Sequence, residues 1–264
     1  MKEFNKSSRI NKNQLFTFSN IKDEFQKEKT NIIYLSSGSK NVDSILGKGF
    51  QSKCMYLVFG SNKTGKTQLC HQLCIQAYKS NLSTIYFDTE NTFRPERIKQ
   101  FADSHNLNFN KILKSVLVSK IMSNNALDLK LNSLNKTIKK SKINLLLIDS
   151  INNYYRLEQG DDKISYETVK KHFLNILEKL NTLTRDFNLI TIATAQISPV
   201  FNKNSIIQEK PVGNQFLNQF FSEYLYLSYK EKEFGYIHLI NSSHLPEKKL
   251  LYRLTHKGIE DYKI

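Results

Sequence analysis

The sequence predicts an α/β fold in which helices flank a central sheet of mostly parallel strands. Short apolar runs that end in glycine or an acidic residue alternate with segments whose apolar residues recur at helical spacing, which is typical of parallel strands joined by helices. About the last 40 residues differ, because three short strand-like runs follow one another with only turns between them. These runs predict an antiparallel C-terminal extension of the sheet.

Each element has a local signal. Strands buried on both faces are unbroken apolar runs, and Met55 to Phe59 is the first of these. Helices repeat an apolar residue every three or four positions, and Pro95 suits the first turn of a helix. In chain order, the predicted elements are strand 55–59, helix 66–79, strand 84–88, a helix from residue 95, a strand near 116–118, a helix ending within 136–142, strand 144–149, helix 166–185, strand 189–195, and strands 223–229, 235–240 and 249–254.

Residues 1–31 are charged and polar without a sustained period, so we expect a tail or linker before one core over 32–264. No uninterrupted apolar stretch approaches the roughly 20 residues that a spanning helix needs, and the N-terminus lacks the apolar centre of a secretory signal. The cysteines, Cys54, Cys70 and Cys74, are odd in number and lack a second Cys or His pair at zinc-ligand spacing. We therefore expect buried free thiols in a reducing compartment, in the cytoplasm, nucleoid or nucleus, and no membrane partner.

The charge is strongly positive, with 39 Lys+Arg against 24 Asp+Glu in 264 residues and a formal net charge of +15. Such a balance indicates a polyanionic partner such as nucleic acid. Most of the basic residues are lysine, and Asn and Ile are also abundant, so A/T-rich codon usage is an alternative origin of the excess. The 17 Phe and 13 Tyr exclude low-complexity disorder, because they supply ample material for a core.

One segment matches the phosphate-binding pattern G-x-x-x-x-G-K-[ST], and it lies between a predicted strand and a predicted helix, as that pattern requires. Its glycines let backbone N–H groups turn toward phosphate oxygens, and the helix N-terminus adds positive potential. Lys66 would neutralise the β- and γ-phosphates and Thr67 would ligate Mg²⁺. The predicted nucleotide-binding residues here are Gly60, Ser61, Asn62, Lys63, Thr64, Gly65, Lys66, Thr67 and Gln68.

Two acidic residues follow other predicted strands. Asp149 ends the run 144–149, the position of the second metal-binding acid in such proteins, although an Asp after a strand can also cap a helix. Glu90 follows the strand ending at Asp88 and is the best candidate for the base that orients the attacking water. A surface glutamate in a turn would have the same spacing.

Several blocks together resemble the RecA/RadA recombinases, specifically the archaeal and eukaryotic branch. Residues 87–97, Phe-Asp-Thr-Glu-Asn-Thr-Phe-Arg-Pro-Glu-Arg, resemble a signature segment of that family, and the blocks 37–49, 64–71, 211–214 and 242–247 agree with it in order and spacing. The resemblance covers about residues 33 to 264 and implies a RecA-like P-loop NTPase core.

The resemblance also implies roles. Glu90 would be the general base, acting with Lys66, and Gln196 would sense the γ-phosphate and relay its presence to the following loop. Arg97 would stack on the adenine. Pro246 would cap the nucleotide of an adjacent subunit, since this family hydrolyses ATP between protomers. Phe16-Thr17-Phe18-Ser19 would be a degenerate subunit-docking motif, or else an ordinary aromatic pair in the tail.

The chain also departs from the family pattern. The resemblance leaves no room for the N-terminal helical DNA-binding domain, Asn91 replaces a usual glycine, and Asn241 replaces a frequent aspartate. The expected first DNA loop, 157–163, carries three acids and one lysine, a poor surface for phosphates, and the second, 197–212, is short. These departures are more similar to a RadB-type paralogue than to the principal strand-exchange enzyme.

Positive charge concentrates outside the expected DNA loops. Residues 99–142 hold nine lysines against two aspartates. Either this segment presents a solvated helix face, or it forms a surface for DNA or a protein partner. Aromatic residues are scarce there, so attraction to the phosphate backbone is favoured over base stacking.

The sequence therefore predicts an ATP-binding, weakly hydrolysing RecA-type paralogue that assists homologous recombination and DNA repair. We expect it to bind single-stranded or branched DNA modestly and to form homo- or hetero-oligomers with a RecA/RadA-type recombinase. One alternative is a full DNA-dependent ATPase that forms strand-exchange filaments. Another is an ATP-gated RecA-fold regulator that does not act on DNA.

Overall fold

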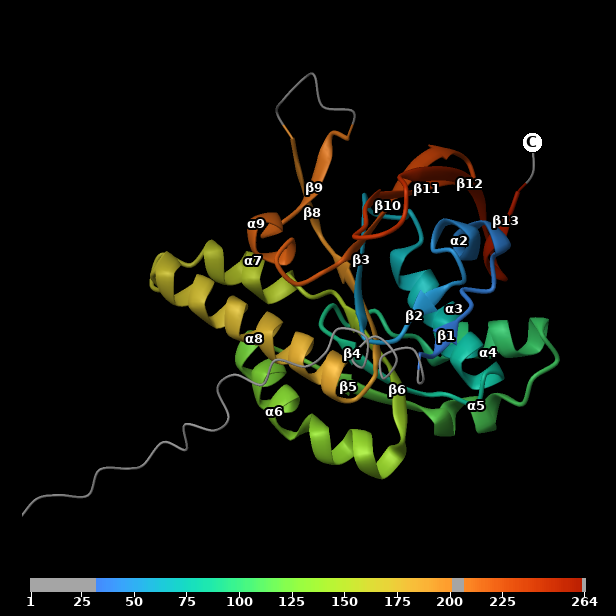
Figure 1. The fold of residues 1–264 in the computed structure, drawn as a ribbon, viewed down its shortest axis with the longest axis horizontal. Helices are drawn as coiled ribbons and strands as arrows, with labels where there is room; N and C mark the ends of the chain where they lie inside the picture. The colour runs from blue at the N-terminus through green and yellow to red at the C-terminus, as the bar shows by residue number, and fades with distance from the viewer. Residues whose placement is uncertain (1–31, 201–206, 263–264) are drawn as a thin grey trace, which may run out of the picture. The chain divides into compact units, whose positions relative to one another are not determined.

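A computed structural model describes residues 32–200 and 207–262, and the fold below belongs to the unit that begins at Ile33 (Figure 1). The predicted tail, the candidate docking motif at 16–19, and residues 201–206 of the second expected DNA loop lie outside the described residues. No helix in 32–200 or 207–262 is long and apolar enough to cross a membrane.

One large sheet forms the centre of this unit. Its strands are β3 (Cys54–Phe59), β4 (Ser83–Asp88), β5 (Val116–Lys120), β6 (Ile143–Asp149), β7 (Ile190–Ala195), β10 (Glu223–Glu231), β11 (Phe234–Asn241), β12 (Lys248–Thr255) and β13 (Gly258–Asp261). They lie in the order β13-β12-β11-β10-β3-β7-β6-β4-β5. The six strands from β10 to β5 are parallel, and the four from β10 to β13 are antiparallel, as predicted for the core and its C-terminal extension.

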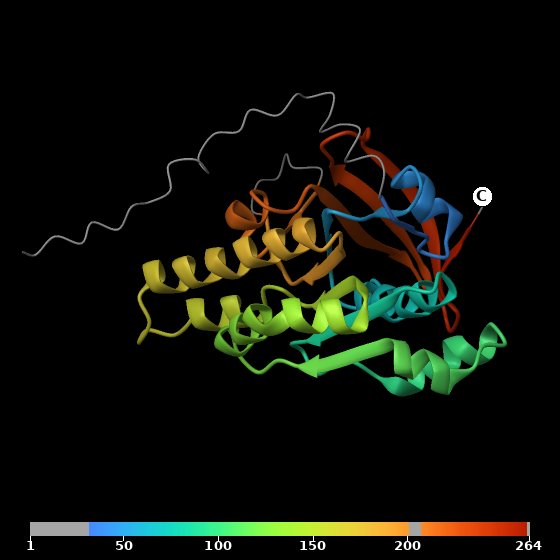
Figure 2. The same ribbon diagram turned by 60° about the horizontal axis from the view of Figure 1, so that its bottom comes forward.

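Helices cover both faces of the sheet. They are α2 (Lys40–Ile45), α3 (Lys66–Lys79), α4 (Pro95–Ser104), α5 (Phe109–Ser115), α6 (Asn124–Ser141), α7 (Asn153–Gln159), α8 (Tyr166–Asp186) and α9 (Asn214–Leu217). Figures 1 and 2 show α3, α4 and α5 grouped together, with α6 and α8 side by side and apart from them. Two short pairs complete the fold, namely β1 (Tyr34–Leu35) with β2 (Phe50–Gln51), and β8 (Ile197–Pro199) with β9 (Glu209–Pro211).

The central strands contain runs of apolar residues without a polar interruption, because the sheet has a hydrophobic core on each face. Successive side chains of a strand point to opposite faces, so Leu145 and Leu147 pack in the core beneath α3, while Leu146 and Ile148 pack in the core beneath α6 and α8. All four side chains are fully buried. This two-sided burial explains why β3, β4, β6 and β7 were predicted to within one residue of their ends.

Local signals explain the helix boundaries. Pro95 occupies the first turn of α4, as predicted, and the Ser123 hydroxyl accepts a hydrogen bond from the Ala126 N–H at the start of α6. The Ser165 hydroxyl caps α8 in the same way. These caps fix where α6 and α8 begin.

The strand register gathers four loops at one edge of the sheet. Asp88 of β4 lies opposite Asp149 of β6, and Phe59 of β3 lies opposite Ala195 of β7. The carboxyl ends of these four parallel strands therefore coincide, and ligands of such folds bind outside that edge. The segments that follow contain the phosphate loop, Glu90, Ser150 and Gln196.

Three expectations need revision. The expected first DNA loop is helical in its first part, because α7 continues through Leu157–Gln159, and the Glu158 carboxylate accepts a hydrogen bond from the Asn124 amide, 2.8 Å away. The elements that were not predicted are strands β1, β2, β8, β9 and β13 and helices α2, α5, α7 and α9. Of the three free cysteines, Cys70 and Cys74 are buried in α3, where burial raises the pKa of both thiols, but Cys54 is partly exposed.

Candidate active site

The phosphate loop is a tight backbone cradle between β3 and α3. A Cβ added to Gly60 would lie 2.0 Å from the Leu227 carbonyl oxygen of β10, so only glycine allows this approach of strand and loop. Gly65 has φ +99° at the start of α3, and its Cβ would lie 2.9 Å from Leu254. The two glycines thus shape a concave backbone whose N–H groups precede a helix N-terminus, an arrangement suited to phosphate.

Lys66 lies across this cradle. Its ammonium donates hydrogen bonds to the carbonyl oxygens of Gly60 and Ser61, at 2.7 and 2.9 Å. Burial lowers the pKa of Lys66, while the nearby carboxylates of Asp149 and Glu90 oppose that shift. An ammonium has three donors, so one remains available for an anion bound in the loop.

Asp149 is the centre of a network of hydroxyl groups at the end of β6, where it is 2% exposed. Its carboxylate accepts hydrogen bonds from Thr67 (2.8 Å), Tyr86 (3.0 Å) and Thr92 (3.1 Å), and also from the Thr194 hydroxyl. Carboxylate and hydroxyl oxygens are the hard ligands that Mg²⁺ prefers, and Mg²⁺ needs few protein carboxylates when phosphates complete its shell. The Asp149 carboxylate and the Thr67 hydroxyl beside it are therefore a donor set that fits Mg²⁺ with a phosphate ligand.

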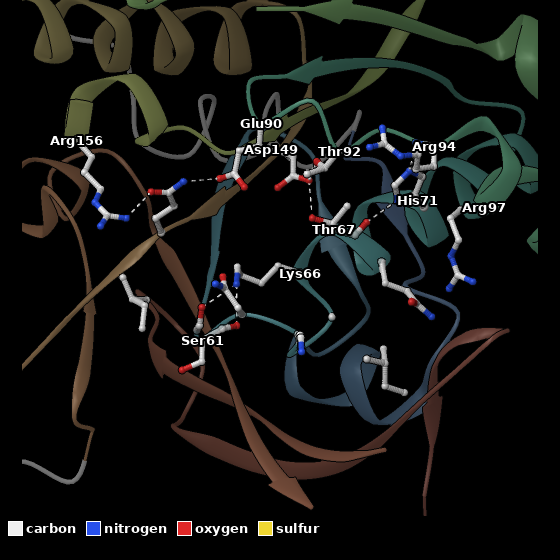
Figure 3. A pocket seen from close by; sticks show the side chains of 18 residues that line it. Ser61, Lys66, Thr67, His71, Glu90, Thr92, Arg94, Arg97, Asp149 and Arg156 are labelled. Atoms are coloured by element: carbon white, nitrogen blue, oxygen red, sulfur yellow. Dashed lines mark hydrogen bonds between the residues drawn. The ribbon is translucent and has the colours of Figure 1, made fainter. Parts of the chain in front are cut away.

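Hydrogen bonds join Glu90, Gln196 and Arg156 into a chain of side chains, and Figure 3 labels Glu90 and Arg156 at its two ends. The Gln196 amide donates to Glu90 Oε1 at 3.0 Å, and its oxygen accepts from the Arg156 guanidinium at 3.0 Å. The Ser150 hydroxyl also donates to Glu90 Oε1. Glu90 therefore has one carboxylate oxygen held by two donors, while Oε2 accepts no hydrogen bond from the described residues.

His71 joins the phosphate-loop helix to the segment 92–97. Its Nε2 accepts a hydrogen bond from the Arg94 backbone N–H at 3.1 Å, and its Nδ1 lies 2.8 Å from the Thr67 carbonyl oxygen. Burial lowers the pKa of His71, which favours the neutral ring with its proton on Nδ1, facing that carbonyl. The ring also stacks on Phe93, with 5.2 Å between ring centroids. His71 thus holds the predicted adenine-contacting segment against α3.

These side chains line one pocket of about 870 Å³. Figure 3 shows Arg156 and Arg97 at opposite ends of it, with Lys66 and Asp149 between them. The predicted site residues that line it are Gly60, Ser61, Asn62, Lys63, Gly65, Lys66, Thr67, Gln68, Glu90, Arg97, Asp149 and Gln196. Thr64 is buried behind the loop, and Pro246 is exposed in the β11–β12 turn, away from the pocket of its own chain.

Sequence reasoning missed several lining residues, namely His71, Thr92, Arg94, Arg156, Ile197 and Leu254. His71 had a signal, since it lies one helical turn after Thr67. Leu254 had none, because the C-terminal strand β12 reaches the phosphate loop only through the tertiary fold.

Strand β12 supports the loop through Tyr252, which is 1% exposed and donates a hydrogen bond of 2.6 Å to the Thr64 carbonyl oxygen. Replacing Tyr252 by phenylalanine should lower the free energy of unfolding by about 1–3 kcal/mol, because the carbonyl loses its partner inside the fold. Urea titration measures this, with Tyr229→Phe as a control, since Tyr229 is 62% exposed. Equal stabilities of the two variants would show that the buried bond contributes nothing.

The fold and the site together define a RecA-like P-loop protein, in which the phosphate loop, the strand-end acid and Glu90 share one edge of a mostly parallel sheet. The chain belongs to the Rad51 family, whose sequence model matches residues 28–262. Proteins of this family are RecA-like, ATP-binding proteins of DNA recombination and repair.

Individual relatives agree with that assignment. The chain is 26% identical over 246 residues to the DNA repair and recombination protein RadA of Cenarchaeum symbiosum, a match that covers 90% of this chain and 61% of the relative. It is 29% identical over 240 residues to the meiotic recombination protein DMC1 of Saccharomyces cerevisiae, covering 86% and 71%. It is 27% identical over 248 residues to the meiotic recombination protein DLH1 of Candida albicans, covering 89% and 75%.

Proposed function

We propose that this protein binds ATP with Mg²⁺ in the pocket at the carboxyl edge of the sheet and hydrolyses the ATP slowly. The observation that carries this proposal is the convergence of Lys66, Thr67, Glu90, Asp149 and Gln196, from four separate strand ends, on one pocket of a Rad51-family chain. Its biological role would be that of a recombinase paralogue that assists homologous recombination and DNA repair.

Nucleotide binding would use the cradle and both ends of the pocket. The backbone N–H groups of 60–67 and the ammonium of Lys66 would hold the phosphates, and Thr67 with Asp149 would hold Mg²⁺. The bound ion would neutralise charge on the phosphate oxygens. Arg97, whose guanidinium lies 5.5 Å from the Phe101 ring centroid, would offer its planar face to the adenine.

Hydrolysis would use Glu90 as the base. A water would attack the γ-phosphorus while Glu90 accepts its proton, and the bond to the β-phosphate oxygen would break to give ADP and phosphate. The two donors on Glu90 Oε1 occupy that oxygen, which leaves Oε2 as the oxygen to accept the proton of the water. Pro246, which is exposed and does not line the pocket of its own chain, would act on the nucleotide of a neighbouring chain. That need for a second chain supports slow turnover by the isolated chain.

The paralogue role follows from the chain's own departures from the recombinase pattern. The acidic 157–163 segment gives a poor surface for DNA, so we infer modest DNA affinity and a need for a principal recombinase as partner. Electron microscopy with ATP and single-stranded DNA tests this inference. Continuous filaments of this chain alone would contradict the inference and favour a strand-exchange enzyme. Absence of filaments would support it, together with ATP-dependent capture of the cell's principal recombinase in a pull-down.

The lysine-rich end of α6 is the proposed contact with DNA. Leu131, Leu134 and Ile138 face the core, which leaves the lysines of this end on the outer face of the helix. In the described part of the chain, no carboxylate lies within 4.0 Å of the ammonium groups of these lysines. This end of α6 leads into the start of β6, at the sheet edge opposite the pocket. The four residues are Lys136, Lys139, Lys140 and Lys142.

Replacing these four lysines together by alanine should weaken binding to single-stranded DNA. It should also flatten the plot of log affinity against log salt, by about 0.7 for each DNA phosphate that the variant no longer neutralises. The measurement is a fluorescence-anisotropy titration from about 50 to 200 mM salt. The control replaces Lys230, Lys232, Lys248 and Lys249 by alanine, which gives the same net charge. These four lysines are exposed on the C-terminal strands and the β10–β11 turn. If the two variants have equal affinity for DNA, the lysine excess reflects codon usage. If the unmodified chain does not bind DNA even near 50 mM salt, that result favours a regulator that does not act on DNA.

A further inference from the structure

Glu223 is a buried carboxylate whose oxygens are unpaired. It is the first residue of β10 and is 1% exposed. In the described part of the chain, neither of its carboxylate oxygens accepts a hydrogen bond. Burial raises the pKa of Glu223, and the nearby Ser242 and His244 oppose that rise. Because buried carboxylates are normally hydrogen-bonded, this one indicates a role other than stability.

The cation that faces Glu223 is His244. Its Nδ1 lies 3.5 Å from Glu223 Oε1, and the imidazole is 53% exposed. No other Lys, Arg or His nitrogen in 32–200 or 207–262 lies within 4.0 Å of this carboxylate. The titratable neighbours on β3 are Cys54 and Tyr56, whose pKa values burial raises, so both are neutral. Glu223 and the imidazolium form of His244 are therefore an ion pair between the sheet and an exposed turn.

That turn, residues 242–247, joins β11 to β12 and is held at three points. Besides the Glu223 contact, the Glu247 carboxylate lies 2.5 Å from Nε2 of His238, which is buried in β11. Leu245 packs against the core, and its N–H donates to the Ser242 hydroxyl at 2.9 Å. Pro246 is exposed between these contacts.

The turn lies at the edge of the sheet opposite the pocket. Strand β10 is parallel to β3 and begins at Glu223, and β11 runs back beside it, so that Asn241 lies opposite Tyr224. The turn therefore starts at the amino edge, whereas the phosphate loop follows the carboxyl end of β3. The two edges meet only when a second copy stacks on the first head to tail.

We propose that Glu223 is a positioning residue for ATP hydrolysis on a neighbouring chain, because through His244 it holds the 242–247 turn in the shape that presents Pro246 to that chain's nucleotide. The inference rests on the proposed function, in which Pro246 acts between chains. This arrangement has a price in stability. The raised pKa means that the folded chain keeps the Glu223 proton over a pH range in which the unfolded chain has lost it, so the free energy of unfolding falls as the pH rises through that range.

The first test replaces the carboxylate by a neutral amide of the same shape. Glu223→Gln should lower ATP hydrolysis per chain by about 2- to 10-fold, the contribution of one ion pair, while its urea midpoint near pH 7 is unchanged or higher. Glu231→Gln makes the same change at the exposed end of β10 and should behave as the unmodified protein. Equal hydrolysis by these two variants would overturn the inference.

Changes at His244 should separate position from stability. His244→Gln leaves the Glu223 carboxylate buried without a cation, so it should lower both hydrolysis and the urea midpoint. His244→Lys keeps a cation and should retain most of the hydrolysis. A His244→Gln variant that hydrolyses ATP as the unmodified protein does would contradict the role of the pair.

Mixing two variants tests whether the effect is between chains. Glu90→Gln keeps the turn but should not hydrolyse ATP, so adding it should restore hydrolysis at the intact pocket of Glu223→Gln. A helper chain that carries both substitutions should not restore it. Equal restoration by both helpers, or by neither, would overturn the inference, as would hydrolysis per chain that does not rise with protein concentration. These outcomes leave ATP binding and hydrolysis intact, whereas absence of both at every concentration would contradict the proposed function and the inference with it.

Discussion

Replacing Lys66 by alanine is expected to weaken ATP binding by about 2–4 kcal/mol, a factor of roughly 30 to 1000 in Kd. The ammonium is held over the phosphate cradle by the carbonyl oxygens of Gly60 and Ser61 and is largely shielded from water. It is therefore already oriented toward an anion, and no other lysine in the loop has these contacts among the described residues. Alanine removes the charge and leaves the phosphates of the ligand without it.

A titration with a fluorescent ATP analogue measures this loss. Lys79→Ala is the matched control, since Lys79 is the exposed last residue of the same helix α3 and does not line the pocket. The control should bind as the unmodified protein does. Equal affinity of the Lys66 and Lys79 variants would mean that nucleotide binds elsewhere or not at all.

Replacing Glu90 by glutamine should lower kcat for ATP hydrolysis by about 10²- to 10⁴-fold while leaving ATP affinity almost unchanged. Glutamine has nearly the same shape, and its oxygen can still accept hydrogen bonds from Ser150 and Gln196, so the pocket should keep its structure. What glutamine cannot do is accept a proton from water. A loss in kcat without a loss in binding is the signature of a group that acts only in the transition state.

Phosphate release under saturating ATP gives kcat, and Glu96→Gln gives the control for the same chemical change at an exposed residue of the first turn of α4. A Glu90 variant with the turnover of the control would remove Glu90 from the reaction. In that case the strand-end position of Glu90 would reflect only an ordinary turn.

The core strands were predictable because each must be apolar on both faces. The sequence around Leu145–Ile148 has no polar interruption, and every one of those side chains is fully buried in one of the two cores. The convergence of Thr67 and Asp149 was predictable for a related reason. Parallel strands place their carboxyl ends at the same edge, so a hydroxyl after β3 and an acid at the end of β6 must come close.

Other features depend on contacts that leave no local trace. Strand β10, like the strands that follow it, mixes apolar and charged residues, but it pairs parallel with β3, a choice that long-range packing makes. Leu254 lines the pocket only because β12 lies against the phosphate loop. Arg156 lies in α7, and its sequence neighbours give no sign that it lines the pocket. That position is clear only from its hydrogen bond to Gln196, which is forty residues later in the chain.

The most direct test of the central claim is a calorimetric titration of the full chain with ATP in the presence of Mg²⁺, repeated at two temperatures so that a binding enthalpy near zero is not mistaken for absence of binding. We expect one ATP to bind per chain, with weaker binding when EDTA removes the Mg²⁺, because Thr67 and Asp149 would then lack the ion that joins them to the phosphates. Absence of binding heat for both ATP and ADP at both temperatures would contradict the account.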